Sequence, residues 1–128
     1  MRRLLPALLL LCGSAAADPH TDYMLYCRGC HRHTGDAVPS ASVPSLHELA
    51  PFLETRAGRE YLVRVPGVSQ TPMSDERLAA VLNWVLIEFN GETLPANFEP
   101  FTAEEVGIAR NKVLEDPLKV RAEVLGSR

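Results

Sequence analysis

The most regular alternation of apolar and polar positions lies between Ser74 and Asn90. Its main apolar residues recur at the spacing of one helical face: Leu78, Val81, Leu82, Val85, Leu86 and Phe89. A second apolar face is formed by Ala80, Trp84 and Ile87. A helix that is apolar on two sides packs on two sides, so this segment predicts a central helix. Ser74 is suited to cap its start, and Asn90-Gly91 to end it.

Two weaker patterns predict helices earlier in the chain. The segment from Asp18 to Cys30 begins with Pro19, which suits a first helical turn. The segment from Thr55 to Val65 carries apolar or small residues spaced for one face: Ala57, Tyr61, Leu62 and Val65. We expect Pro66-Gly67 to end this second helix.

Three further helices are shorter. Ser45 can cap a brief helix that runs through Leu49 and is limited by Pro51. Thr102-Ala-Glu-Glu105 has the form of a capping box and predicts a helix to about Leu114. Asp116-Pro117 then starts a last short helix.

The remaining segments read as loops. Prolines, serines and glycines concentrate in residues 34–44, 68–73 and 92–100. No segment shows the period of a β-strand, so the chain should be all-α.

The first residues have the three regions of a secretory signal peptide. Met1-Arg2-Arg3 is basic, Leu4 to Cys12 is apolar apart from Pro6, and Ala15-Ala16-Ala17 supplies a cleavage site. We expect cleavage after about Ala17, which also removes Cys12; lipid attachment at Cys12 is the alternative. The chain then divides into a leader at 1–17, a core domain at 18–90 and a C-terminal extension at 91–128. No later apolar run is long enough to span a bilayer.

The net charge of the chain disfavours one class of function. The full chain carries 13 basic and 16 acidic residues. Cleavage removes two of the arginines and leaves a net charge of about −5. This disfavours nucleic-acid binding, which needs a basic face. An acidic surface could steer the protein toward basic patches on partners, or simply keep it in solution.

The chemistry concentrates in Cys27-Arg28-Gly29-Cys30-His31. Two cysteines separated by two residues and followed by histidine form the pattern on which c-type haem is attached. The two thiols bond to the haem vinyl groups, and His31 becomes an axial ligand of the iron. A zinc site would need further ligands at suitable spacing. A thioredoxin-like pair would sit beside a strand–helix unit, and a plain disulfide is the remaining alternative.

The iron then needs a sixth ligand or an open position. The candidates are Met24, Met73, His20, His33 and His47. Met73 lies well beyond the attachment motif, in a loop just before the central helix, where the chain could cross the other face of the haem. A thioether ligand would raise the reduction potential relative to a second histidine. We therefore expect Met73 to ligate the iron; otherwise it is a packing methionine.

These features together resemble class I monohaem cytochromes c of bacterial type. The resemblance covers Asp18 to about Asn90 and includes the attachment motif, Tyr23 four residues before it, Pro44-Ser45-Leu46 after it and the Met73 loop. It departs from the family pattern in two ways. Pro19 stands where glycine is common, and proline precedes Met73 rather than following it.

The resemblance implies a small cytochrome c fold around one haem c. It implies that the Pro44 carbonyl accepts a hydrogen bond from His31 and so fixes the imidazole plane. It also implies an aromatic contact between the first and last core helices, here Tyr23 or Tyr26 against Trp84 or Val85. Arginines 56, 59 and 64, and Trp84, could meet the haem propionates.

The expected function is periplasmic electron transfer on this haem, with His31 and Met73 as axial ligands. An iron with both axial positions filled has no place for a substrate, which favours an electron carrier over an enzyme. Its partners would be a donor dehydrogenase and an acceptor oxidase or other cytochrome. One alternative is a dedicated subunit of a periplasmic dehydrogenase, docked through the extension. Another is a ligand-binding or sensing haem protein in which Met73 leaves the iron open.

Overall fold

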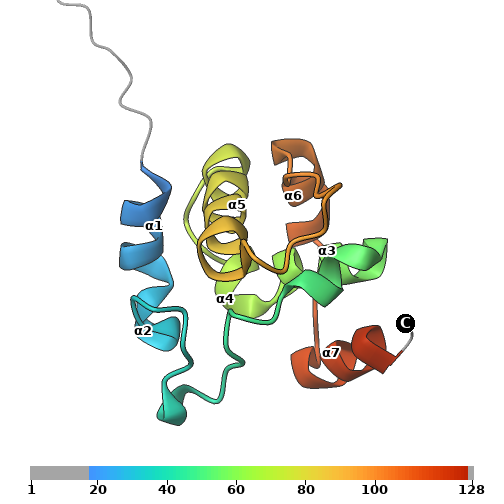
Figure 1. The fold of residues 1–128 in the computed structure, drawn as a ribbon, viewed down its shortest axis with the longest axis horizontal. Helices are drawn as coiled ribbons and strands as arrows, with labels where there is room; N and C mark the ends of the chain where they lie inside the picture. The colour runs from blue at the N-terminus through green and yellow to red at the C-terminus, as the bar shows by residue number, and fades with distance from the viewer. Residues whose placement is uncertain (1–17, 127–128) are drawn as a thin grey trace, which may run out of the picture.

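The computed structural model describes residues 18–126, so the predicted signal peptide and Cys12 lie outside the described residues. Figure 1 shows short helices that surround the longer α5. In chain order they are α1 (Pro19–Tyr26), α2 (Arg28–His31), η1 (Pro39–Ala41), η2 (Ala50–Glu54), α3 (Arg56–Arg64), α4 (Pro66–Ser69), α5 (Asp75–Asn90), α6 (Ala103–Arg110) and α7 (Pro117–Gly126). The described residues contain no strand, which confirms the all-α prediction. None of the described helices is long and apolar enough to cross a membrane.

Side-chain caps fix where five of the helices begin. In each, a side-chain oxygen accepts a hydrogen bond from the backbone N–H three residues later; the capping residues are Asp18, Thr55, Ser74, Thr102 and Asp116. Such caps satisfy backbone N–H groups that have no partner within the helix. All five starts, and the end of α5 at Asn90, agree with the sequence prediction.

The structure corrects several details. Residues 45–49 are not helical; Ser45 accepts a hydrogen bond from the His47 N–H, and the helical turn starts at Ala50. α3 ends at Arg64, just before Pro66-Gly67, as predicted. Pro66 then opens a further short helix, α4, that the sequence did not predict, because proline fits a first helical turn. The second predicted helix does not bury Ala57, and α6 ends at Arg110, before Leu114.

The first helix packs on α5 through an aromatic contact, as predicted. The rings of Tyr23 and Trp84 are centred 5.0 Å apart, and the Phe89 ring is 5.5 Å from that of Tyr23. Beside these rings, Arg77 donates two hydrogen bonds to the buried carboxylate of Asp22, at 2.6 and 3.1 Å. A bidentate pair adds a fixed direction to the apolar contact, so the crossing of α1 and α5 has a defined orientation.

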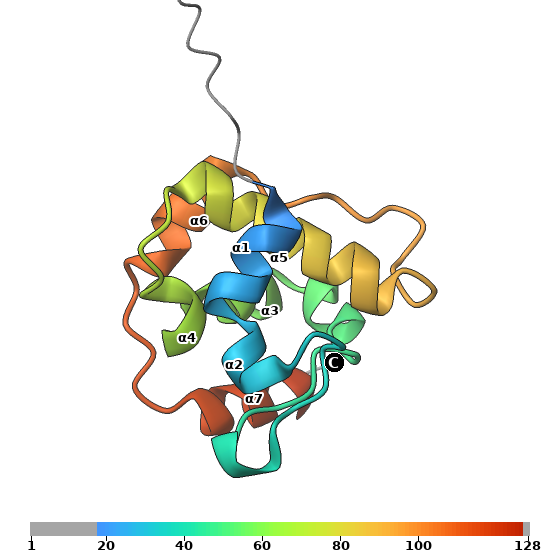
Figure 2. The ribbon, with the colours of Figure 1, turned by 90° about the vertical axis from the view of Figure 1, so that its left-hand side faces the viewer.

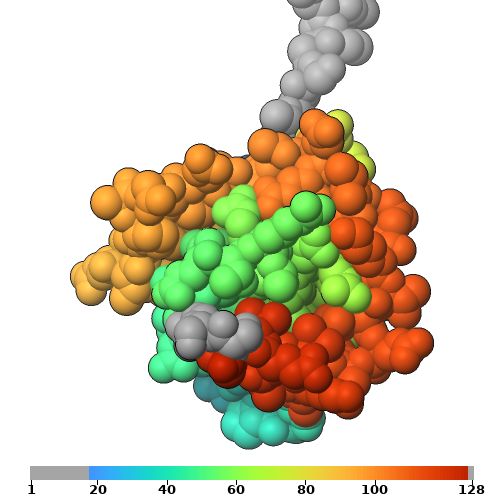
Figure 3. Space-filling view, turned by 90° about the vertical axis from the view of Figure 1, so that its right-hand side faces the viewer, coloured from blue at the N-terminus to red at the C-terminus, as the bar shows by residue number. Residues whose placement is uncertain are grey.

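The C-terminal segment shares the core with the rest of the chain. Phe101, Val106, Ala109, Leu114 and Val124 are buried in the same apolar cluster as the residues of α5. In Figure 3 the orange and red segments after α5 surround the green region of α3. Residues 91–126 therefore contribute to the fold itself.

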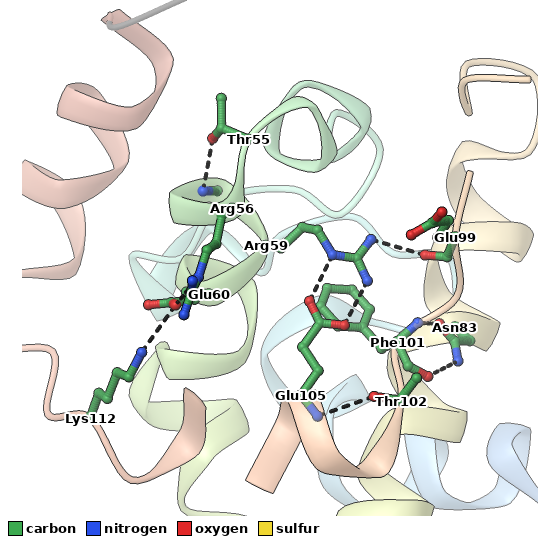
Figure 4. Close-up of polar contacts among 11 residues, drawn as sticks. Thr55, Arg56, Arg59, Glu60, Asn83, Glu99, Phe101, Thr102, Glu105 and Lys112 are labelled. Atoms are coloured by element: carbon green, nitrogen blue, oxygen red, sulfur yellow. Dashed lines mark hydrogen bonds and ion pairs between the residues drawn. The ribbon is translucent and has the colours of Figure 1, made fainter. Parts of the chain in front are cut away.

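A polar cluster fixes this segment against α3 and α5 (Figure 4). Arg59 donates two hydrogen bonds to the Glu105 carboxylate, at 2.7 and 2.8 Å, and a third to the Glu99 carbonyl. Its guanidinium also lies 4.2 Å from the centre of the Phe101 ring. Asn83 both donates to and accepts from the Phe101 backbone. These contacts hold Phe101 from two sides.

The loop that follows the attachment motif is tied to the end of α5. Gly35 adopts a φ of 80°, and a Cβ there would meet the Phe89 ring at 2.9 Å, so only glycine fits. Asn90, 2% exposed, accepts a hydrogen bond from the Leu49 N–H and donates one to the Leu46 carbonyl, both at 2.8 Å. Asn90 thus does more than end a helix: it fixes the backbone at 46–49.

We predict that Asn90→Ala destabilises the protein by about 2–4 kcal/mol, because two backbone groups lose their partners in a buried environment. Urea unfolding of the haem-loaded protein measures the change. Asn111→Ala is the matched control, since that side chain is exposed and its loss should cost less than about 0.5 kcal/mol. Equal effects of the two variants would contradict the assigned role of Asn90.

Candidate functional site

An apolar cavity of about 420 Å³ lies next to the attachment motif. This volume is within the range of roughly 300–1,000 Å³ that is typical of ligand and cofactor sites. Cys27, Cys30 and His31 line one part of it. In Figure 1, α2 lies to the left of α4 and α7, and residues of all three helices line the cavity. Many of the other lining residues are valines and leucines: Val43, Leu46, Leu49, Leu62, Val65, Val68, Leu78, Val81, Leu82, Val85 and Leu86.

The motif forms a helical turn directly after α1. The Cys27 N–H donates to the Tyr23 carbonyl, and the N–H groups of Cys30 and His31 donate to the Cys27 carbonyl. The Tyr23 hydroxyl donates to the Arg32 carbonyl at 2.6 Å, just beyond the motif. One buried tyrosine therefore contacts both α5 and the end of the motif, and fixes the turn relative to the cavity.

Both cysteines are free thiols. Burial is the main cause that raises the Cys27 pKa to about 11, with smaller contributions from the charges of Asp22 and Cys30. Cys27 is therefore a neutral thiol at physiological pH. Within residues 18–126 no three histidine, cysteine or acidic side chains form a metal-ion site, so the zinc alternative finds no support there.

His31 is chemically suited to bind a metal in this cavity. Burial lowers the pKa of its imidazole, which favours the neutral form that can donate a lone pair. Its Nδ1 atom is buried and has no hydrogen-bond partner within the described part of the chain. Buried polar atoms are rarely left unpartnered, so the orphaned nitrogen fits a histidine whose partner is a cofactor. Pro44 lines the same cavity, and its hydrogen bond to His31 stays a prediction.

Two curated proteins resemble the chain over most of its length. A cytochrome c-552 of Thermus thermophilus is 36% identical over 142 aligned positions, which cover 96% of this chain and 95% of that protein. The chain belongs to the class I c-type cytochromes. A second Thermus thermophilus cytochrome c-552 is also 36% identical, over 115 positions that cover 76% of this chain and 87% of that protein. No protein-family model matches the chain.

Membership of this family means that the cytochrome carries covalently bound haem c with its iron. The apolar cavity, the two free thiols and the unpartnered imidazole fit that cofactor. The expected small cytochrome c fold agrees with the all-helical structure.

Met73 is buried at 5% exposed and belongs to the apolar core. It lies in the loop between α4 and α5. Thr71 of this loop and Val68 of α4 line the cavity, but Met73 is not among the lining residues. The other candidates lie elsewhere. His20 packs on Trp84, and His47 is exposed and lies 3.4 Å from Asp36. The sequence thus places the loop correctly beside the cavity, while ligation by Met73 stays a prediction.

The sequence analysis did not predict that residues of the C-terminal segment line the cavity. Phe101, Pro117, Leu118 and Arg121 all line the cavity. Their only signal in the sequence was an apolar pattern after residue 100, which does not say where the segment packs. Arg121 was not among the arginines expected to meet the propionates; its guanidinium lies 4.8 Å from the centre of the Phe52 ring.

The three arginines that the sequence offered for the propionates do not line the cavity. Arg56 pairs with Glu60. Arg59 contacts Glu105, and Arg64 donates to the carbonyls of Lys112 and Val113. All three therefore stabilise contacts within and around α3, and Arg121 is the arginine that lines the cavity.

We predict that Tyr23 sets a pH limit on the stability of the cytochrome. Burial raises its pKa to about 12 from an ordinary 10.0. The folded state therefore favours the protonated phenol, and the stability this provides is lost as pH rises from about 10 to about 12. Tyr23→Phe removes the hydrogen bond to the Arg32 carbonyl and should cost about 1–2 kcal/mol at pH 7.

Thermal unfolding at pH 7, 10 and 11.5 measures this effect. Wild type should lose more stability between pH 10 and pH 11.5 than Tyr23→Phe does. Tyr26→Phe, which alters a 40% exposed residue, is the control and should behave as wild type. A parallel decline in all three proteins would show that Tyr23 does not cause the pH dependence.

Proposed function

We propose that this cytochrome transfers electrons through one haem that is bonded to Cys27 and Cys30 and ligated by His31. The observation that carries the proposal is the convergence of these three side chains on one apolar cavity, with the His31 Nδ1 buried and unpartnered. When bound, the haem supplies an iron that cycles between the ferric and ferrous states. The chain's contribution is to hold it and exclude water.

The iron's second axial ligand is, in this proposal, Met73. Support comes from the position of its loop, which lines the cavity through Thr71, close to Val68 of α4. Burial of Met73 also keeps a thioether in a dry environment, where it would favour the ferrous state. Pro44, on the same cavity, would accept the His31 N–H and fix the imidazole plane.

Electrons would pass at the mouth of the cavity. Tyr26 and Leu118 both line the cavity and are 40% and 62% exposed. They therefore mark where the interior meets solvent and where a partner protein can approach the haem edge. We propose donor and acceptor redox proteins with basic docking surfaces, since the mature chain has a net charge of about −5.

The predicted leader supports a periplasmic location, where covalent attachment takes place by resemblance to bacterial cytochromes c. We propose a carrier rather than an enzyme, because two protein ligands would leave the iron no position for a substrate.

One observation favours a second candidate function. Met73 is buried, yet it does not line the cavity. A haem with an open axial position would bind small ligands such as carbon monoxide, so the protein would bind or sense ligands instead of only carrying electrons.

We predict that Met73→Leu removes the far-red thioether-to-iron absorption band, makes the ferric iron high-spin and lowers the reduction potential. Leucine conserves volume and should leave the fold intact. Met24→Leu is the matched control, because that methionine lies on α1, close to the motif in sequence. Its spectrum should equal that of wild type.

Visible spectra of the oxidised and reduced proteins, with and without carbon monoxide, decide between the two functions. Electron transfer with His31 and Met73 as ligands predicts that carbon monoxide binds readily only to the Met73 variant. Rapid binding by the wild type, with no far-red band, would overturn the Met73 assignment and favour the second candidate.

A further inference from the structure

One arginine of α6 contacts almost the whole loop that carries Met73. Arg110, 15% exposed at its side chain, donates to the carbonyls of Ser69, Thr71 and Met73, at 2.7–3.2 Å. It also pairs with the Asp75 carboxylate at 3.0 Å. A single guanidinium thus binds three loop carbonyls and the first residue of α5.

Apart from Arg110, the loop is held by the burial of Met73 in the apolar core and by short-range backbone bonds. Its remaining backbone bonds are local: the Thr71 N–H donates to the Val68 carbonyl and the Met73 N–H to the Thr71 carbonyl. Such short-range bonds do not fix a loop relative to the body of a protein. Arg110 connects it to α6, and the planar fork of guanidinium donors suits several carbonyls at once.

A glycine on α6 permits this contact. A Cβ at Gly107 would come within 2.5 Å of the Asp75 Oδ2 atom. Any larger residue there would displace the carboxylate that pairs with Arg110. Gly107 thus allows α6 to approach the start of α5 closely enough for Arg110 to pair with Asp75.

The loop adjoins the wall of the cavity. Val68 and Thr71 line the cavity, and Met73 follows them. We propose that Arg110 is a positioning residue that holds residues 69–73 closed over the haem and so controls how readily an external ligand reaches the iron. The inference rests on the proposed haem site, and it assigns the C-terminal segment a role in the chemistry of that site.

Arg110 could act only by holding the C-terminal segment against the rest of the protein, and Arg59 provides the comparison. Arg59 also ties the segment to the body of the protein, through Glu105, but it contacts no residue of the loop. If Arg110 acts only by holding the segment in place, loss of either arginine should have the same effect. If it acts on the loop, only Arg110 should alter access to the iron.

The test uses the haem-loaded, ferric protein and imidazole as the external ligand. Stopped-flow mixing measures the binding rate for wild type, Arg110→Gln, Arg110→Lys and Arg59→Gln. We expect Arg110→Gln to raise the rate at least about tenfold, which corresponds to about 1.4 kcal/mol in loop opening. Lysine keeps the charge but has a single nitrogen, so Arg110→Lys should also bind imidazole faster than wild type. The rate for Arg59→Gln should stay within about twofold of the wild-type rate.

Hydrogen exchange gives a readout that does not depend on the iron ligand. The amides of Thr71 and Met73 should lose protection in Arg110→Gln and keep it in Arg59→Gln. Equal imidazole rates and equal loop protection in wild type and Arg110→Gln would overturn the inference, as would equal effects of the two glutamine variants. Failure of the proposed haem site can be told apart from failure of the Arg110 inference, because in the first case the wild-type protein would bind no haem covalently.

Discussion

Enclosure of a cavity of about 420 Å³ is the physical constraint on which the rest of this small structure depends. Residues 18–90 alone cannot line it, since Phe101, Pro117, Leu118 and Arg121 complete its wall. A small domain buries a limited core, so a large apolar cofactor at its centre requires cover from every available segment. Figure 2 shows the consequence: α2, α4 and α7 gather at one end of the molecule, below α1, α5 and α6. The C-terminal segment, whose role was open at the level of sequence, is part of that enclosure.

Enclosure also sets the electrostatics of the site. Burial raises the pKa of Cys27 and lowers that of His31, so both side chains are neutral where they line the cavity. Three ion pairs lie away from the cavity lining: Asp22 with Arg77, Glu105 with Arg59 and Asp75 with Arg110. The buried carboxylate of Asp22 needs such a partner, and each pair joins two segments that are distant in sequence.

Local signals explain what could be predicted. The start of α5 at Ser74, the start of α3 at Thr55 and the attachment motif depend on neighbouring residues, and all were found from the sequence. The roles of Asn90 and Arg110 depend on partners about 40 positions away, such as the Leu49 N–H and the Thr71 carbonyl, which no local pattern encodes. Two short segments were predicted wrongly for a related reason. Residues 45–49 are not helical and residues 66–69 are, because tertiary contacts override local helix propensity.

The attachment of haem and its two axial ligands are tested together by a redox-titrated visible spectrum of the mature protein, recorded after extraction of any haem that is not covalently bound. We expect the haem to be retained and its spectrum to change in a single reversible one-electron step between low-spin ferric and ferrous forms. Loss of the haem on extraction would contradict attachment at Cys27 and Cys30. A retained haem with a high-spin ferric spectrum would contradict closure of the iron by His31 and Met73.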